Sequence, residues 1–197
     1  MDTFKCNYHM HSTYSDGTLS PAKLVKKSVD MEYDVIALTD IGTIEGIKEF
    51  MAACEAAEIT GVTGVEFITK NELQGREFTV NILGLKFDPD NTELIEALSE
   101  GTEGISTEKA IELINRAGGI SSLADPAGIP DMGERGSDEF WNDLDALTRD
   151  LKKKGLKAME CIYPSNSEEE EYRLIQLAGK YHLHITSGTG VLEADMK

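Results

Sequence analysis

The sequence has no long apolar run, few cysteines and few basic residues. No apolar stretch reaches the roughly 20 residues that span a bilayer, so we expect no membrane association. The opening residues, MDTFKCNYH, have neither the basic nor the apolar region of a signal peptide. Cys6, Cys54 and Cys161 are odd in number and far apart, which favours reduced thiols in the cytoplasm over a disulfide framework or a zinc finger.

Positive charge is scarce. The 19 Lys and Arg residues face 36 Asp and Glu residues, and the net charge at pH 7 is −17. A field of that sign repels polyanions, which argues against a long nucleic acid as a partner. A small phosphorylated ligand remains compatible with the sequence, because bound cations can hold its phosphate.

The 197 residues suffice for one buried core, and we treat residues 1–197 as one domain. Strand and helix patterns alternate along the chain, which predicts an α/β fold whose parallel sheet is either doubly wound or closed into a barrel. A hairpin turning near Gln74-Gly75 is also predicted. We expect strands at 8–10, 34–40, 61–67, 77–87, 120–126, 156–164 and 182–188, and helices at 21–32, 44–58, 90–101, 106–119, 137–155 and 167–181.

Two of the four histidines lie close to the start of the chain. His9 and His11 are separated by one residue, so on a strand both rings point to the same face, where neutral imidazoles can chelate one cation. An H-x-H pair alone is weak evidence for a metal site. His182 and His184 lie at the start of the last predicted strand, away from the end where we expect a site, and we interpret them as structural.

Carboxylates follow or end the predicted strands. Asp16 lies in the loop after the first strand, Asp40 closes the second, Glu66 closes the third and Asp125 follows the strand residues ISSLA at 120–124. Carboxylates crowded at one sheet edge repel unless a cation offsets them, which favours Zn, Mn or Fe with nitrogen and oxygen ligands. Plainer roles remain open: Asp16 can tighten an Asp-Gly turn, and Asp40 can cap the next helix.

These residues occur in motifs that resemble the PHP (polymerase and histidinol phosphatase) domain, above all its small phosphoesterases acting on nucleotides and short RNA ends. The motifs follow in the family's order over nearly the whole chain. They are HMHSTYSDGTLSPAKLV, VIALTDIGTIEGI, GVEF, NILGLKFDPDN, INRAGGISSLADP and ITSGTGVLE.

The resemblance implies a distorted seven-stranded β/α barrel and, in intact members, two or three metal ions acting on a phosphoester. His9, His11, Asp16 and Glu66 match the family's metal ligands. Other ligand positions have changed: where the family pattern has histidine or aspartate, this chain has Ile41, Asn81, Asp125, Gly190 and Leu192, and in a looser alignment Asn166.

We therefore expect fewer than three divalent ions: one cation on His9, His11 and Glu66, or none. Asp125 is assigned as a further ligand or a base, and Asp40 as a residue that orients a ligand histidine. Residues 88–106 resemble a shortened remnant of a helical insert that covers the family's active site. The expected function is hydrolysis of a small phosphate ester. The alternative is an inactive PHP-like protein that binds a ligand or partner.

Overall fold

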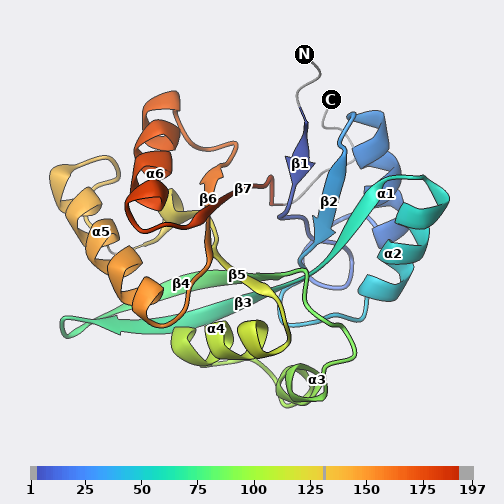
Figure 1. Ribbon diagram of the computed structural model, residues 1–197, viewed down its shortest axis with the longest axis horizontal. Helices are drawn as coiled ribbons and strands as arrows, with labels where there is room; N and C mark the ends of the chain where they lie inside the picture. Colours follow the sequence, from blue (N-terminus) through green and yellow to red (C-terminus); the bar gives the residue numbers. More distant parts are fainter. Residues whose placement is uncertain (1–3, 131, 191–197) are drawn as a thin grey trace.

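The chain folds into a seven-stranded, nearly closed barrel with helices packed on its outside (Figure 1). The structure is a computed structural model that describes residues 4–130 and 132–190. The strands are β1 (Cys6–Asn7), β2 (Val35–Leu38), β3 (Thr60–Leu73), β4 (Arg76–Leu85), β5 (Ile120–Leu123), β6 (Ala158–Ile162) and β7 (His184–Ser187). The helices are α1 (Pro21–Asp30), α2 (Ile47–Ala56), α3 (Thr92–Ser99), α4 (Thr107–Arg116), α5 (Asp138–Lys153) and α6 (Glu168–Lys180), with a short 3-10 turn at Pro126–Gly128.

The strands pair in chain order from β1 to β7. All neighbouring pairs are parallel except those of β4, which runs antiparallel to both β3 and β5. The predicted hairpin is confirmed, because β3 and β4 turn at Gln74 and Gly75, both with positive φ. The sheet is therefore mixed, with β4 as the one antiparallel strand among those described.

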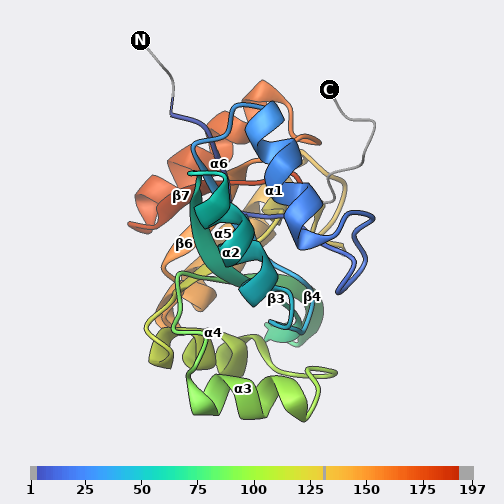
Figure 2. The ribbon, with the colours of Figure 1, turned by 90° about the vertical axis from the view of Figure 1, so that its right-hand side faces the viewer.

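Hydrogen bonds between the first and last strands bring the ends of the sheet together. The Tyr8 N–H donates to the Ser187 carbonyl over 2.8 Å, and the Ser187 hydroxyl donates to the Cys6 carbonyl over 2.8 Å. Met10 and Gly190 add an isolated parallel bridge. Helices α1 and α2 lie on one side of this barrel and α5 and α6 on the other (Figure 1), so that α1 and α2 are in front in Figure 2.

The first strand is displaced from its predicted position. It covers Cys6–Asn7 rather than residues 8–10, because the chain leaves the ladder after Asn7. The His9 carbonyl then accepts hydrogen bonds from the Thr189 and Gly190 N–H groups, and the Met10 N–H bonds to the Thr39 hydroxyl. The two early histidines thus lie just beyond the first strand, in a segment held by loops from the far edge of the barrel and from β2.

Alternation along the strands separates an outer core from a polar interior. Val65 and Phe67 on β3 pack in the large apolar cluster beneath α4, α5 and α6, so Glu66 between them points into the barrel. A second cluster lies between β2 and the helices α1 and α2. The interior holds a small apolar group that includes Ala37, Leu83 and Ala124.

The segment at 88–106 contains one short helix, α3, which packs beside α4 through ion pairs from Glu93 to Lys109 and Arg116. After this helix, Thr102 lies close to Gly42: a Cβ on Gly42 would be 2.9 Å from the Thr102 hydroxyl oxygen. The segment thus passes the loop after β2. Its interpretation as the remnant of a lid stays a prediction. None of the helices in the described part of the chain is long and apolar enough to cross a membrane.

Close approach of β3 to β2 requires a glycine two residues before Glu66. A Cβ on Gly64 would lie 2.3 Å from the Leu38 carbonyl oxygen and 2.6 Å from a Thr39 methyl group. We expect Gly64→Ala to lower the free energy of unfolding in urea by about 1–3 kcal/mol, because the backbone has to move.

Gly179→Ala in α6 is the matched control, because nothing lies within 4 Å of its added methyl group. It should raise the free energy of unfolding by about 0.5–1 kcal/mol through the helix propensity of alanine. Equal effects of the two substitutions would show that the β2–β3 contact is looser than the structure indicates.

Candidate metal centre

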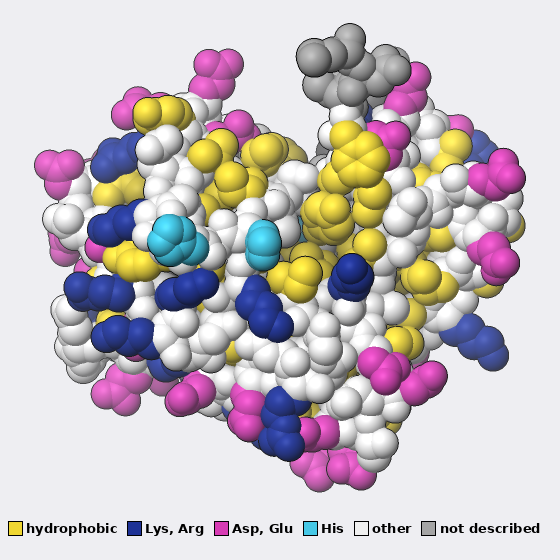
Figure 3. Space-filling view, in the orientation of Figure 1, with side chains coloured by type: hydrophobic (Ala, Val, Ile, Leu, Met, Phe, Trp, Pro, Cys, Tyr) yellow, Lys and Arg dark blue, Asp and Glu magenta, His cyan; other side chains and the backbone are white. Residues whose placement is uncertain are grey.

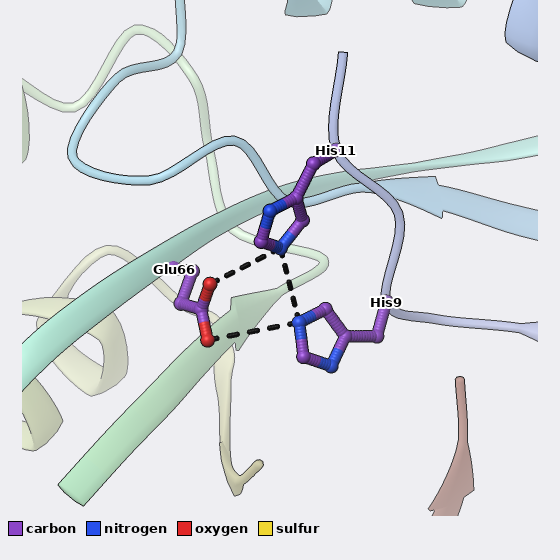
Figure 4. Close-up of side chains that lie close together, drawn as sticks. All are labelled: His9, His11 and Glu66. Atoms are coloured by element: carbon purple, nitrogen blue, oxygen red, sulfur yellow. Dashed lines mark hydrogen bonds and ion pairs between the residues drawn. The ribbon is translucent and has the colours of Figure 1, made fainter. Parts of the chain in front are cut away.

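Three buried side chains converge inside the barrel mouth. His9, His11 and Glu66 are at most 5 % exposed, and each offers a ligand atom within 4.8 Å of the other two. The two Nε2 atoms are 3.0 Å apart, and Glu66 lies 3.6 Å from His9 Nε2 and 3.1 Å from His11 Nε2. Figure 4 shows both rings and the carboxylate turned toward one point.

Two outer carboxylates determine which ring nitrogens face that point. Glu160 contacts His9 Nδ1 at 3.1 Å, and Asp16 contacts His11 Nδ1 at 2.5 Å. An ionised carboxylate only accepts hydrogen bonds, so each Nδ1 carries a proton and each neutral ring presents the Nε2 lone pair inward. This donor set, two imidazole nitrogens and a carboxylate, fits a divalent cation such as zinc, manganese or iron.

Glu160 is the functional candidate that sequence reasoning missed. It is fully buried on β6, where it contacts His9 and also accepts the Asp125 backbone N–H at 2.8 Å. Gly188 makes room for it, because a Cβ there would lie 2.0 Å from Glu160 Oε1 and 2.3 Å from the His9 Cβ. The signal was present in the sequence: a lone glutamate inside the apolar strand AMECI, the same pattern that singled out Glu66.

Asp125 lies beside this network in a strained conformation. Its φ of 32° is left-handed, and its buried Oδ1 has no hydrogen-bond partner among residues 4–130 and 132–190. Burial and the nearby Glu160 carboxylate raise the pKa of Asp125. Gly128 is required opposite it, since a Cβ there would lie 2.2 Å from Asp125 Oδ2. A buried carboxylate oxygen without a partner in the described part of the chain, beside Glu160, fits a group that meets a proton or a ligand.

Asp40 organises the loop that carries His11. Its carboxylate accepts hydrogen bonds from the Ser12 N–H, the Ser12 hydroxyl and the Ser15 hydroxyl, at 2.6 to 2.8 Å. Any effect of Asp40 on an imidazole therefore passes through the backbone of this loop. Gly17 completes the turn, because a Cβ there would lie 2.1 Å from the His11 carbonyl oxygen.

The PHP domain model matches residues 7–183 of the chain. The chain belongs to the PHP domain family. Among curated proteins it is 36% identical to a 5'-3' exoribonuclease of Haemophilus influenzae over 128 residues, which cover 65% of this chain and 42% of that protein. It is 32% identical to a 3',5'-nucleoside bisphosphate phosphatase of Chromobacterium violaceum over 120 residues, 60% of this chain and 41% of that protein. The matches thus span about two fifths of these relatives.

Solved structures share the fold. An amidohydrolase of Chromobacterium violaceum, solved with sulfate and no metal, superposes with a TM-score of 0.80 at 21% identity, covering 95% of this chain and 87% of that chain. A Bifidobacterium adolescentis protein solved under the name of a metal-dependent phosphoesterase gives 0.72 at 19% identity, covering 94% and 87%. The expected seven-stranded PHP-type barrel is confirmed.

Besides Asp125, the structure describes four of the positions where the resemblance implies replaced ligands. Ile41 forms a backbone bridge to Glu66, so an apolar residue follows Asp40 beside this centre. The Asn81 amide donates to Glu66 Oε1 at 2.9 Å and supplies no charge. The Asn166 amide is turned to the Cys161 carbonyl, 3.5 Å away. Gly190 pairs with Met10 and has no side chain to offer. Leu192 lies outside the described residues.

Without a metal, protons hold the three converging groups together. Burial lowers the pKa of His9, but the Glu160 and Glu66 carboxylates outweigh it and raise the pKa from 6.5 to about 10. The same balance raises the pKa of His11, beside Glu66. Burial raises the pKa of Glu66, but the two imidazoles outweigh it and lower the pKa from 4.5 to about 2. At neutral pH the metal-free centre is therefore an ion-paired cluster.

This cluster predicts a pH window for the metal-free protein. His9 contributes to the free energy of unfolding in full below pH 6.5. This contribution is lost as the pH rises toward about 10, because the folded pKa lies above the unfolded value. The Glu66 contribution is complete above pH 4.5 and is lost as the pH falls toward about 2. After chelation, the free energy of unfolding in urea should be highest between pH 4.5 and 6.5. His9→Gln should reduce the decline of this free energy between about pH 7 and 10. A variant with the wild-type slope there would place the titrating group elsewhere.

Proposed function

We propose that this PHP domain is a phosphoesterase with a reduced centre, in which His9, His11 and Glu66 hold one divalent cation. The observation that carries the proposal is the convergence of two Nε2 atoms and one carboxylate on a single buried point. When bound, such a cation supplies positive charge for a phosphoryl oxygen and lowers the pKa of an attacking water. Zinc, manganese and iron all suit this donor set.

The chain's own side chains account for the remaining tasks. Glu160 and Asp16 hold the rings of His9 and His11 through their Nδ1 protons. Asp125, whose Oδ1 has no partner among the described residues and whose pKa is raised, would accept a proton or add a further oxygen ligand. Asp16 meets the outer nitrogen of His11, so its assignment as a direct metal ligand remains a prediction.

A small phosphorylated compound is the substrate class that we propose. The relatives are named an exoribonuclease and a nucleoside bisphosphate phosphatase, and both names point to phosphate esters of nucleotides. The net charge of −17 argues against a long nucleic acid as the ligand. Cys6, Cys54 and Cys161 are free thiols, which is consistent with a cytoplasmic location.

The environment of Glu66 supports a second candidate, a PHP-like protein that binds its ligand without turnover. Asn81 occupies one oxygen of Glu66 with an N–H donor, and Ile41 brings an apolar side chain to the same strand end. A centre with these neighbours has fewer ligands for additional ions and less charge to stabilise a transition state.

Metal content tests the centre directly. Protein purified without chelator should contain about one zinc, manganese or iron ion per chain by elemental analysis, and His9→Ala and Glu66→Gln should each lose it, because two of three ligands bind a cation weakly. His182→Ala is the matched control: this exposed histidine lies before β7, and its loss should leave the metal content unchanged. Three ions per chain, or a metal retained in both centre variants, would contradict the proposal.

Turnover distinguishes the two candidate functions. With added manganese or zinc, the whole chain should release phosphate from a nucleoside 3',5'-bisphosphate, and Glu66→Gln should lower kcat by at least about 100-fold through loss of the cation. Stoichiometric binding of the bisphosphate with its recovery unchanged would instead establish the non-catalytic candidate. Activity that is equal in Glu66→Gln would exclude this centre as its source.

Glu160 should set the metal affinity. We expect Glu160→Gln to weaken zinc binding by about 10–100-fold, measured by calorimetry against a competing chelator, because an amide no longer holds the His9 Nδ1 proton as firmly as a carboxylate. Glu168→Gln, an exposed change on α6 with the same loss of charge, is the control. Unchanged affinity in Glu160→Gln would show that the His9 ring is oriented by packing alone.

A further inference from the structure

A second cavity opens at the other mouth of the barrel, away from the metal centre. It has a volume of about 580 Å³. Its wall includes Thr60, Ile120, Ala158 and His184, which are the first residues of β3, β5, β6 and β7. The metal centre, in contrast, lies among the far ends of the strands. We call this cavity, between the first residues of these strands, the barrel-mouth pocket. Its volume suits a small organic molecule.

The pocket exists because the barrel is poorly filled at this end. Barrel interiors are usually packed with bulky branched side chains. Here β6 contributes Ala158 and β7 contributes Thr186, whose hydroxyl is bonded to Ser122 at 3.0 Å. The remaining wall is largely apolar and includes Val62 and Leu85. An unfilled apolar chamber of this size gains stability when an apolar group enters it.

Exposed apolar side chains continue the wall outward. Ile185 is 46% exposed and Met51 is 36% exposed, and both line the pocket. Tyr8 adds an aromatic ring that is part of the interior apolar cluster. The apolar surface is therefore continuous from the barrel interior to the rim.

The rim carries cationic and donor groups in a strongly acidic protein. The side chains of Lys86 and His184 line the pocket and have no hydrogen-bond or ion-pair partner among residues 4–130 and 132–190. Lys152 donates to the His182 carbonyl, and Lys157 Nζ donates to the Gly119 carbonyl, which precedes the wall residue Ile120. Two further ammonium groups therefore lie near this rim. Figure 3 shows Lys and Arg side chains gathered around histidines on one face of the molecule.

Lys86 is also held in an unusual backbone conformation. Its φ of 57° is left-handed, which is uncommon for a residue with a side chain, and its N–H donates to the Thr63 carbonyl at 2.8 Å. The turn fixes where the lysine leaves the barrel, directly after β4. A cation at the edge of an apolar chamber, with the rest of the protein at −17, provides a local attraction for one anionic group.

We propose that the barrel-mouth pocket binds an amphipathic small anion: an alkyl or aryl body carrying one carboxylate, sulfonate or phosphate. The apolar body lies against Val62, Leu85 and Ile185, and the acidic group faces Lys86 and His184. Both parts of the ligand are needed. A neutral apolar ligand would make no ion pair with Lys86, and a simple anion would not fill the apolar cavity. This ligand site is separate from the metal centre and does not depend on the proposed phosphoesterase activity.

The anionic dye 1-anilinonaphthalene-8-sulfonate is a suitable probe, since it combines an aryl body with one sulfonate. Fluorescence titration of the folded whole chain should show one saturable site per chain, and decanoate should displace the dye. Lys86→Glu and Ile185→Asp should each weaken binding by about tenfold or more, because each places a carboxylate where the sulfonate or the ring lies. Both positions are exposed, so the variants should unfold at the wild-type urea midpoint.

Lys23→Glu on α1 is the matched control. Lys23 is exposed, has no partner among the described residues and makes the same change in charge far from the pocket wall. It should leave dye affinity unchanged, and Lys86→Glu should leave the metal content unchanged. Absence of saturable binding, or equal affinity in wild type, Lys86→Glu and Ile185→Asp, would overturn the proposal. A loss of affinity in Lys23→Glu as large as in Lys86→Glu would reduce the effect to net charge and would also overturn it.

Discussion

The burial of the Glu66 carboxylate is the constraint on which the site depends. A buried anion is costly unless charged or donor groups surround it. Glu66 is 1% exposed and is surrounded by the His9 and His11 rings and the Asn81 amide. A proton on an imidazole or a bound cation can each supply the compensating charge. The metal-free cluster and the metal centre are thus two ways of meeting the same electrostatic demand.

The barrel brings these groups together from distant parts of the chain. His9 follows β1, Glu66 lies on β3 and Glu160 on β6, and they meet because the β1–β7 contact joins the two edges of the sheet. Glycines permit this crowding at Gly64 and Gly188, where any side chain would collide with backbone or with the site itself. The Thr189 and Gly190 N–H groups hold the backbone of His9, and the loop around Asp40 fixes the approach of His11.

The two ends of the barrel have opposite chemistry. The end with His9, His11 and Glu66 concentrates buried carboxylates and imidazoles, and it favours a cation. The other end is apolar, with Lys86 and His184 at its rim, and it favours an anion with an apolar body. The interior apolar group that includes Ala37, Leu83 and Ala124 lies within the same barrel. The fold can therefore present two separate binding sites without an additional domain.

The sequence by itself determined the alternation of strands and helices along the chain, the hairpin at Gln74-Gly75, and the candidates His9, His11 and Glu66. Periodicity, turn residues and ligand types are local properties. Only the tertiary structure decided that Glu160 rather than Asp40 meets an imidazole and that Asp16 faces the outer nitrogen of His11. It also decided that Asp125 Oδ1 is buried without a hydrogen bond from any described residue. Those facts depend on contacts between strands and loops far apart in the chain. Side-chain direction at such contacts is set by barrel closure and packing, and no local pattern encodes it.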